Sequence, residues 1–166
     1  MMKKVYILLI CVSLSGMFHA CDSNYVSHSN VGKHVFQILK TLDTLPKETF
    51  RENFIAFEQL KSMINTIKEG EKLIPKIAQM TSETYNSDIN YIFDNIRVEG
   101  ANNYILWKDI EYVDYKHQTT RNRSMTLNFG TLFFKKNQEN FKIGIYWLTD
   151  LNVSGLLGLG GLQRVE

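Results

Sequence analysis

The sequence predicts an α+β fold in which N-terminal helices pack on a curved antiparallel meander of three to four strands. Between residues 31 and 100, apolar side chains recur at the three- and four-residue spacing of helices. Between residues 104 and 162, aromatic and β-branched side chains recur at every second position, and polar turns separate the runs. Helices that precede the strands, instead of alternating with them, are typical of helices packed on one face of an antiparallel sheet.

The chain begins with the parts of a secretory signal. Two lysines precede a short apolar run, and Ala20 is a small residue at its end. The run is shorter than the roughly 20 residues that a bilayer-spanning helix needs. We therefore expect a signal peptide over residues 1–20 and a polar tether over residues 21–30. The composition does not change along the remainder, so we expect residues 31–166 to form one domain.

Cys21 is the only cysteine outside the leader, because Cys11 lies within the apolar run. A single cysteine cannot form an internal disulfide. Residues 17–21, Met-Phe-His-Ala-Cys, resemble the lipobox of bacterial lipoproteins, although Phe18 replaces the usual leucine. The resemblance implies that Cys21 carries acyl chains and anchors the chain to a membrane of the cell envelope. Cleavage after Ala20 by an ordinary signal peptidase is the alternative and would give a secreted soluble protein.

The charges of the chain are balanced. The sequence has 19 basic and 17 acidic residues, and removal of the leader with its two lysines leaves 17 of each. Nucleic-acid binding requires a concentrated basic surface. The one basic group outside the leader is Lys116, His117, Arg121 and Arg123, which we interpret as a solvated turn. We therefore expect no nucleic-acid partner.

Three helical segments are expected before the strands. Asn30 is a candidate N-cap for the first helix, and Pro75 suits the first turn of the third. Gly70 and Gly100 are expected to end the second and third helices. The segments are expected at residues 31–42, 50–67 and 73–96.

Three strands follow with strong alternation and a fourth with weaker alternation, because it contains several glycines. Polar residues 116–124 are interpreted as a break, and residues 135–140 as the turn of a hairpin. Gly130 lies where the apolar set changes from odd to even positions, as a β-bulge would place it. Trp147 shares the parity of three apolar neighbours and is expected on the core face. The strands are expected at residues 104–115, 125–134, 141–147 and 156–162.

This order of elements, with Trp107 near the start of the first strand and a glycine in the second, resembles the cystatin-like cone. Polyketide cyclases, the nuclear transport factor two superfamily and small lipoproteins of Gram-negative bacteria share that cone. The resemblance covers about residues 31–162 and implies a concave pocket between helices and sheet. The aromatic residues that could line such a pocket are, Tyr112 apart, interpreted first as core residues, and lining the pocket is their alternative role. They are Trp107, Tyr112, Phe129, Phe133, Tyr146 and Trp147.

We expect the chain to bind a ligand or a protein and not to catalyse a reaction. Enzymes of that superfamily place an ionisable residue in the pocket, and Asp109 or Asp114 beside Tyr112 could serve as a general base. Their alternation with apolar residues fits the solvated face of a strand better. His34 is expected at the surface or at the edge of the core. We find no ligand spacing for zinc and no phosphate-binding loop, so no metal and no cofactor are expected.

These observations predict a non-catalytic, membrane-anchored envelope lipoprotein that binds a small apolar ligand or another envelope protein. One alternative is an immunity or inhibitor lipoprotein directed against a toxin or a protease, which the small neutral domain also fits. The other is an enzyme of the isomerase or cyclase kind with a carboxylate base in the cone.

Overall fold

We describe the fold from a computed structural model of the chain, over residues 30–65, 79–122, 125–150 and 153–165. The expected signal peptide, Cys21 and most of the tether lie outside these residues, as do Gly70 and Pro75. The α+β class is confirmed: helices precede an antiparallel four-stranded sheet. Before the sheet lie α1 (Val31–Lys40), α2 (Lys47–Arg51), α3 (Phe57–Asn65), α5 (Ser82–Asn102) and the 3-10 helix η2 (Trp107–Asp109).

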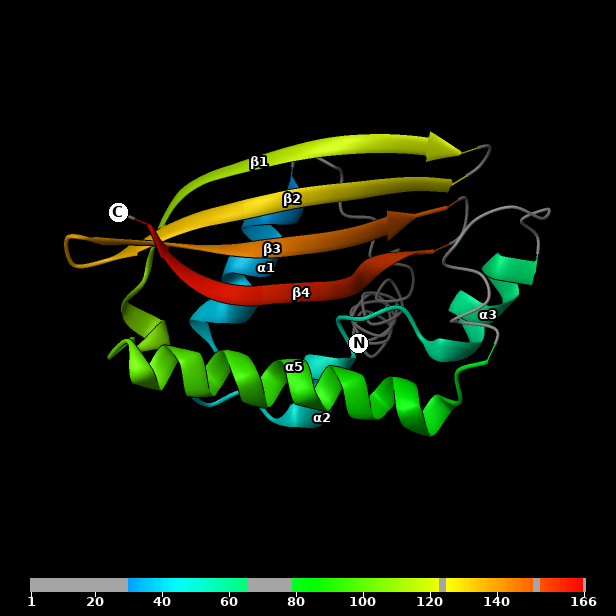
Figure 1. Cartoon of the computed structure of the whole chain (residues 1–166), viewed down its shortest axis with the longest axis horizontal. Coiled ribbons are helices and arrows are strands. Elements are labelled where there is room, and N and C mark those ends of the chain that lie inside the picture. The colour runs from blue at the N-terminus through cyan, green and yellow to red at the C-terminus, as the bar shows by residue number, and fades with distance from the viewer. Residues whose placement is uncertain (1–29, 66–78, 123–124, 151–152, 166) are drawn as a thin grey trace, which may run out of the picture.

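The sheet is a simple meander whose strands are hydrogen-bonded in chain order, β1-β2-β3-β4. Figure 1 shows α1 crossing behind the strands and α5 running along β4. We call the face toward the helices the inner face and the opposite face the outer face. The hairpin between the second and third strands turns at Asn137, whose φ is 57°. The strands are β1 (Glu111–Asn122), β2 (Met125–Lys136), β3 (Glu139–Thr149) and β4 (Ser154–Val165).

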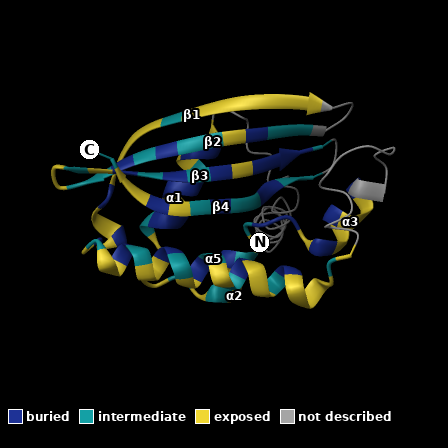
Figure 2. Cartoon of the chain, viewed as in Figure 1, coloured by how far each residue is buried: buried dark blue, intermediate teal, exposed yellow. Residues whose placement is uncertain are grey.

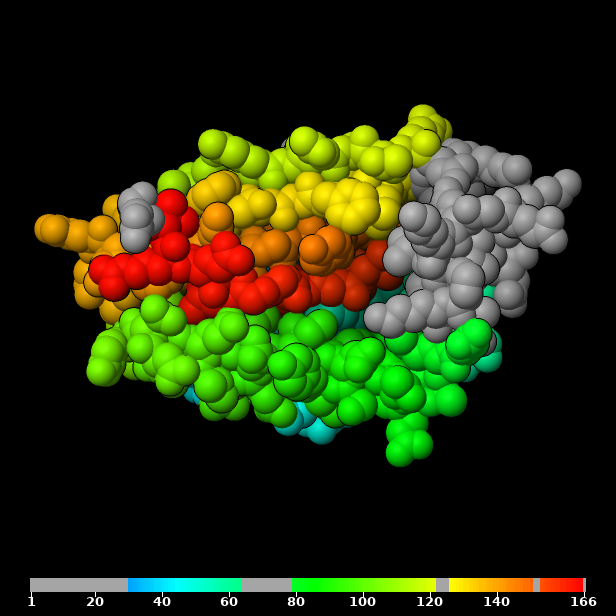
Figure 3. Space-filling view, in the orientation of Figure 1, coloured from blue at the N-terminus to red at the C-terminus, as the bar shows by residue number. Residues whose placement is uncertain are grey.

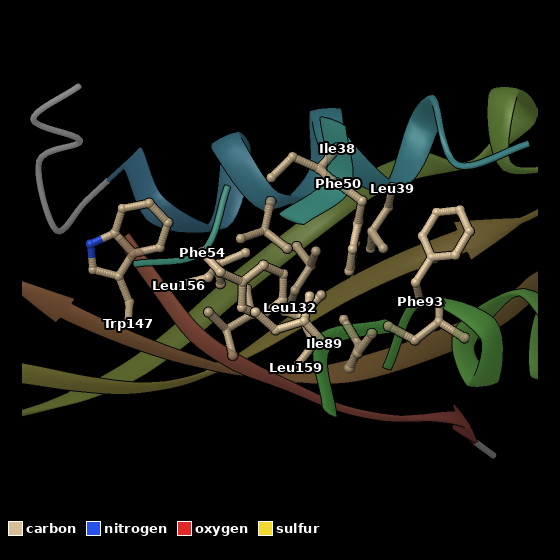
Figure 4. Packing of buried hydrophobic residues seen from close by; sticks show 14 of the residues in the cluster. Ile38, Leu39, Phe50, Phe54, Ile89, Phe93, Leu132, Trp147, Leu156 and Leu159 are labelled. Carbon is tan, nitrogen blue, oxygen red and sulfur yellow. The ribbon is translucent and has the colours of Figure 1, made fainter. Parts of the chain in front are cut away.

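The hydrophobic core lies between the inner face and the helices (Figure 4). Ile38 and Leu39 of α1 and Ile89 and Phe93 of α5 point toward the strands. Trp147 lies on this face, as its parity predicts, and is 2% exposed. Burial of such a continuous apolar face supplies most of the favourable free energy of folding. The inner-face strand residues of the core are Leu132, Phe134, Phe141, Ile143, Ile145, Trp147, Leu156, Leu159 and Leu162. Leu148 is also buried, but it pairs with Leu127 and has the parity of the outer face.

The helices differ from their expected bounds where tertiary contacts intervene. The expected helix at residues 50–67 is divided in two, because the backbone of Asn53 and Ile55 bonds to Leu156 of β4. The third helix begins at Ser82, after Thr81 accepts a hydrogen bond from the Thr84 N–H at 3.1 Å. Asn30 precedes α1, but its side chain makes no capping bond.

Gly100 lies inside α5 and does not end it, so that expectation was wrong. A side chain at this position would collide with the indole of Trp107, which packs on the helix there. The glycine therefore serves close packing between α5 and η2, and the helix continues to Asn102.

The first strand is displaced from its expected position. Residues 107–109 form η2, and β1 then runs from Glu111 to Asn122, through the segment interpreted as a polar break. A register shift between Tyr112 and Asp114 marks a β-bulge at Val113. Lys116, His117 and Arg121 therefore lie on a strand, and the solvated-turn interpretation was wrong for these three.

The expected β-bulge at Gly130 was also wrong. The pairing of β2 with both of its neighbours continues through Gly130 without a shift. The inner face carries even-numbered residues throughout β2, so Leu127 and Phe129 point to the outer face. Gly130 is needed for another reason: the ring of Tyr115 on β1 lies over it and would collide with any Cβ atom.

Candidate functional site

The two edges of the sheet, β4 and β1, differ in how much of their backbone is hydrogen-bonded to the rest of the chain. At β4, the Ile55 N–H donates to the Leu156 carbonyl at 3.0 Å, and the Leu156 N–H donates to the Asn53 carbonyl at 3.2 Å. Further along β4, the Leu162 N–H donates to Oε2 of Glu99 on α5 at 2.6 Å. Part of the backbone of this edge therefore has partners within the chain.

The β1 edge is open along the described strand. Among the described residues, β1 pairs with β2 on one side and with no strand on the other. Every described side chain from Glu111 to Arg121 is exposed except that of Tyr115, which is half-buried. Figure 2 shows the contrast, because β1 is coloured as exposed over most of its length while β2 and β3 alternate with buried residues.

The helices cover only the first part of β1. Phe36 of α1 meets Tyr112 edge-on, with 5.5 Å between ring centroids. Gly32 in the first turn of α1 lies against the Tyr115 ring, so closely that a Cβ atom would collide with it. His117 and Arg121, which follow on the inner face, are exposed. The second half of β1 thus extends past α1.

The backbone of β1 is regular where it is open. Its register with β2 is unbroken from Asp114 to Asn122. The Tyr115 N–H donates to Oδ1 of Asp114 at 2.8 Å, which indicates that this N–H points away from β2. In an antiparallel strand, alternate residues turn both backbone groups to the same side. His117, Thr119 and Arg121 therefore present their N–H and C=O groups to the open edge.

The inner face beside this edge carries a polar network. The Thr119 hydroxyl donates to Oδ1 of Asn128, a fully buried residue, at 2.7 Å. The Tyr115 ring stacks on His117 at 5.2 Å, and burial, followed by the charge of Tyr112, raises the pKa of Tyr115 to about 12. Of these contacts, the Thr119–Asn128 bond joins β1 to β2, and it leaves the open edge of β1 uncovered.

The outer face carries a second exposed group of side chains, which we call the aromatic patch: Phe129, Phe133 and Tyr146. Phe129 and Tyr146, 41% and 44% exposed, meet edge-on at 5.7 Å. The ammonium group of Lys116 lies over the ring of half-buried Phe133 at 5.4 Å. Figure 3 shows this face of the sheet, across which no described helix passes.

The structure divides the six aromatic residues proposed for a pocket among separate places. Trp107 and Trp147 are each 2% exposed and belong to the core. Tyr112 lies at the start of the open edge, on the inner face. The three residues of the aromatic patch point the other way, into the outer face. The six therefore do not line one cavity.

The carboxylates considered as general bases lie on the surface. Asp109 pairs with Lys136 at 3.1 Å, and exposed Asp114 holds the Tyr115 N–H. His34 is half-buried and meets the Trp147 ring edge-on at 5.6 Å, and burial lowers its pKa. Within the described ranges, no three His, Cys, Asp or Glu side chains gather as a metal site would require.

The open edge of β1 was not predicted from the sequence, because residues 116–124 were interpreted as a break between strands. A signal for it was present, because residues 116–124 contain no glycine or proline and include the β-branched pair Thr119 and Thr120. The alternation of apolar residues disappears there because neither face of this part of β1 is covered.

The chain matches no model of a known protein family, no curated protein and no solved structure at a significant level. In the part of the chain that the structure describes, no helix combines the length and apolarity needed to cross a bilayer.

Proposed function

We propose that this chain is a non-catalytic envelope lipoprotein that binds a partner protein by strand addition at β1. A peptide in extended conformation can join an exposed sheet edge, with main-chain hydrogen bonds giving affinity and alternate side chains giving specificity. The observation that supports this proposal is the long, regular and exposed edge of β1. At the opposite edge of the sheet, by contrast, part of the β4 backbone is hydrogen-bonded within the chain.

The anchoring part of the proposal rests on the leader and on Cys21. Acyl chains stabilise membrane attachment by about 0.8 kcal/mol per buried methylene group, and stable anchoring needs more than one chain. Replacing Cys21 with serine should release the chain from the membrane fraction. A variant that still sediments with membranes in high salt would contradict lipidation at this residue.

Strand addition can be tested with a backbone block at the open edge. His117→Pro removes an N–H that points away from β2, and edge strands tolerate proline at such positions. His117→Ala removes the same side chain and keeps the N–H, so it is the matched control. A photo-crosslinking residue at Gln118 reports contacts of β1, and one at exposed Val98 on α5 reports contacts of the opposite layer.

We expect a crosslinked envelope protein from Gln118 in the parent and in His117→Ala, but not in His117→Pro. We expect no such adduct from Val98. Circular dichroism must first show that His117→Pro is folded. If the folded proline variant gives the same adduct as the parent, the partner does not bind through the β1 backbone and the proposal is wrong.

A further inference from the structure

We infer that the segment which adds to β1 is acidic and is recognised by Lys116 and Arg121. This inference rests on the proposed function and adds the chemistry of the partner. It starts from the charge of the β1-β2 hairpin: residues 111–136 contain five lysines and arginines and two carboxylates, Glu111 and Asp114, and no aspartate or glutamate follows Asp114 in the hairpin. The other acidic residues of the described chain lie outside the hairpin, several of them on α5.

Two of the five basic residues are neutralised within the fold. Lys135 pairs with Glu111 at 3.0 Å, and Lys136 pairs with Asp109 at 3.1 Å. Lys116 and Arg121 lie on the open strand and form no ion pair with any described carboxylate. Both are exposed. The charge that remains uncompensated is therefore concentrated on the edge that is open.

The geometry of β1 sets the spacing of the complementary charges. Lys116 lies on the outer face, since it pairs with Thr131, and the contact with Phe133 keeps its ammonium group there. Arg121 lies on the inner face, opposite Thr126. The two are five residues apart, an odd number that matches their opposite faces. A partner strand would place its two carboxylates at the same spacing.

A second copy of this chain fits the edge less well. Two β1 strands paired with each other would bring two sets of Lys116, His117 and Arg121 into one short ladder. Asp114 is the one carboxylate within residues 114–122 to oppose them. Like charges opposite one another destabilise a strand pair, and lysine on an edge is a common protection against self-association.

A nucleic acid would neutralise Lys116 and Arg121, but it would not satisfy both kinds of backbone group on the open edge. The open edge presents alternating N–H donors and C=O acceptors, and another peptide strand matches both kinds. A phosphate backbone offers acceptors alone, so it would leave the carbonyl groups of β1 to water. The edge and the charges together therefore favour an acidic extended peptide.

The test uses the full chain and nine-residue peptides of alternating threonine and valine. One peptide carries glutamate at its second and seventh positions, and two matched peptides carry glutamine or lysine there. Affinity is measured by fluorescence anisotropy, and strand addition by slowed amide exchange at His117 and Thr119. We expect the glutamate peptide to bind about three- to tenfold more tightly than the glutamine peptide at low salt, from two exposed charge pairs.

Charge reversal provides the control. The double variant Lys116→Glu, Arg121→Glu should prefer the lysine peptide, because both of its edge charges are inverted. If the glutamine peptide binds the parent as tightly as the glutamate peptide and slows exchange in β1, the acidic inference is wrong while strand addition stands. If no peptide slows exchange there, strand addition itself fails. Tighter binding of a single-stranded oligonucleotide than of the glutamate peptide, lost in the double variant, would overturn the inference in favour of nucleic acid.

Discussion

The β4 edge and the β1 edge end the same sheet in opposite ways. Beside β4, segment 53–55 and Glu99 take up backbone groups of Leu156 and Leu162. Beside β1, the described chain provides no comparable partner, and the side chains past Tyr115 are polar on both faces. An unpaired edge promotes aggregation unless it is covered, charged or interrupted. The fold uses partial coverage at β4 and charge with one β-bulge at β1, and the second solution leaves more of the backbone accessible.

The largest expected contrast is between the core beside β4 and the surface of β1. Trp147→Ala removes a buried aromatic ring and its bond to Ser154 of β4, and should lower the free energy of unfolding by about 3 to 5 kcal/mol. Thr120→Ala on exposed β1 should change it by less than about 0.5 kcal/mol. Urea unfolding measures both. An unchanged midpoint for Trp147→Ala would mean that this face is not the core.

Gly130→Ala tests how β1 is attached to its neighbour. The added methyl group would collide with the Tyr115 ring, and overpacking of this kind costs about 1 to 3 kcal/mol. Combining it with Tyr115→Ala removes the obstacle, so the alanine at position 130 should cost much less in that background. Strictly additive losses in the double variant would show that the ring does not set the need for glycine.

Glu99→Ala should partly open the closed edge. The Leu162 N–H loses a carboxylate acceptor at 2.6 Å, and we expect a loss of about 1 to 2 kcal/mol together with faster exchange of the Leu162 amide. Asp88→Ala, which removes an exposed carboxylate from the same helix, is the control. Equal amide exchange in the two variants would mean that Glu99 does not protect this edge.

The smallest effect concerns pH and the helix that lies over the sheet. Burial lowers the pKa of His34 in the folded chain below the ordinary value of 6.5, so the unfolded chain binds a proton more readily. This contribution to stability is present above that value and is lost as the pH falls toward the folded-state pKa. His34→Gln should reduce the difference in unfolding free energy between about pH 7.5 and about pH 5.5. Identical differences in parent and variant would contradict a buried neutral His34.

The sequence predicted the parts of the sheet in which one face is buried. Phe141, Ile143, Ile145 and Trp147 alternate because β3 has a core on one side and solvent on the other. The α+β order and the hairpin turn followed from the same pattern. These features depend on local alternation and on turn residues, which a single sequence displays directly.

The candidate site could not be predicted in this way. On β1 past Tyr115 neither face is buried, so no alternation marks the strand, and its pairing with β2 is determined by the hairpin. The β-bulge predicted at Gly130 was wrong. The apolar residues of β2 change parity there because Phe129 of the aromatic patch is an exposed residue of the outer face. Division of the second helix depends on Leu156, about a hundred residues away along the chain.

The contact of Gly32 with Tyr115 also defines a mechanical path. The expected tether joins the domain at the first turn of α1, and that turn lies directly on β1. A pull between a membrane anchor and a partner strand would pass through α1 and Tyr115 into β1, without crossing the core near Phe93. The pull would then reach the partner through the main-chain hydrogen bonds between β1 and the added strand, and the ladder between β1 and β2 would lie outside this direct path.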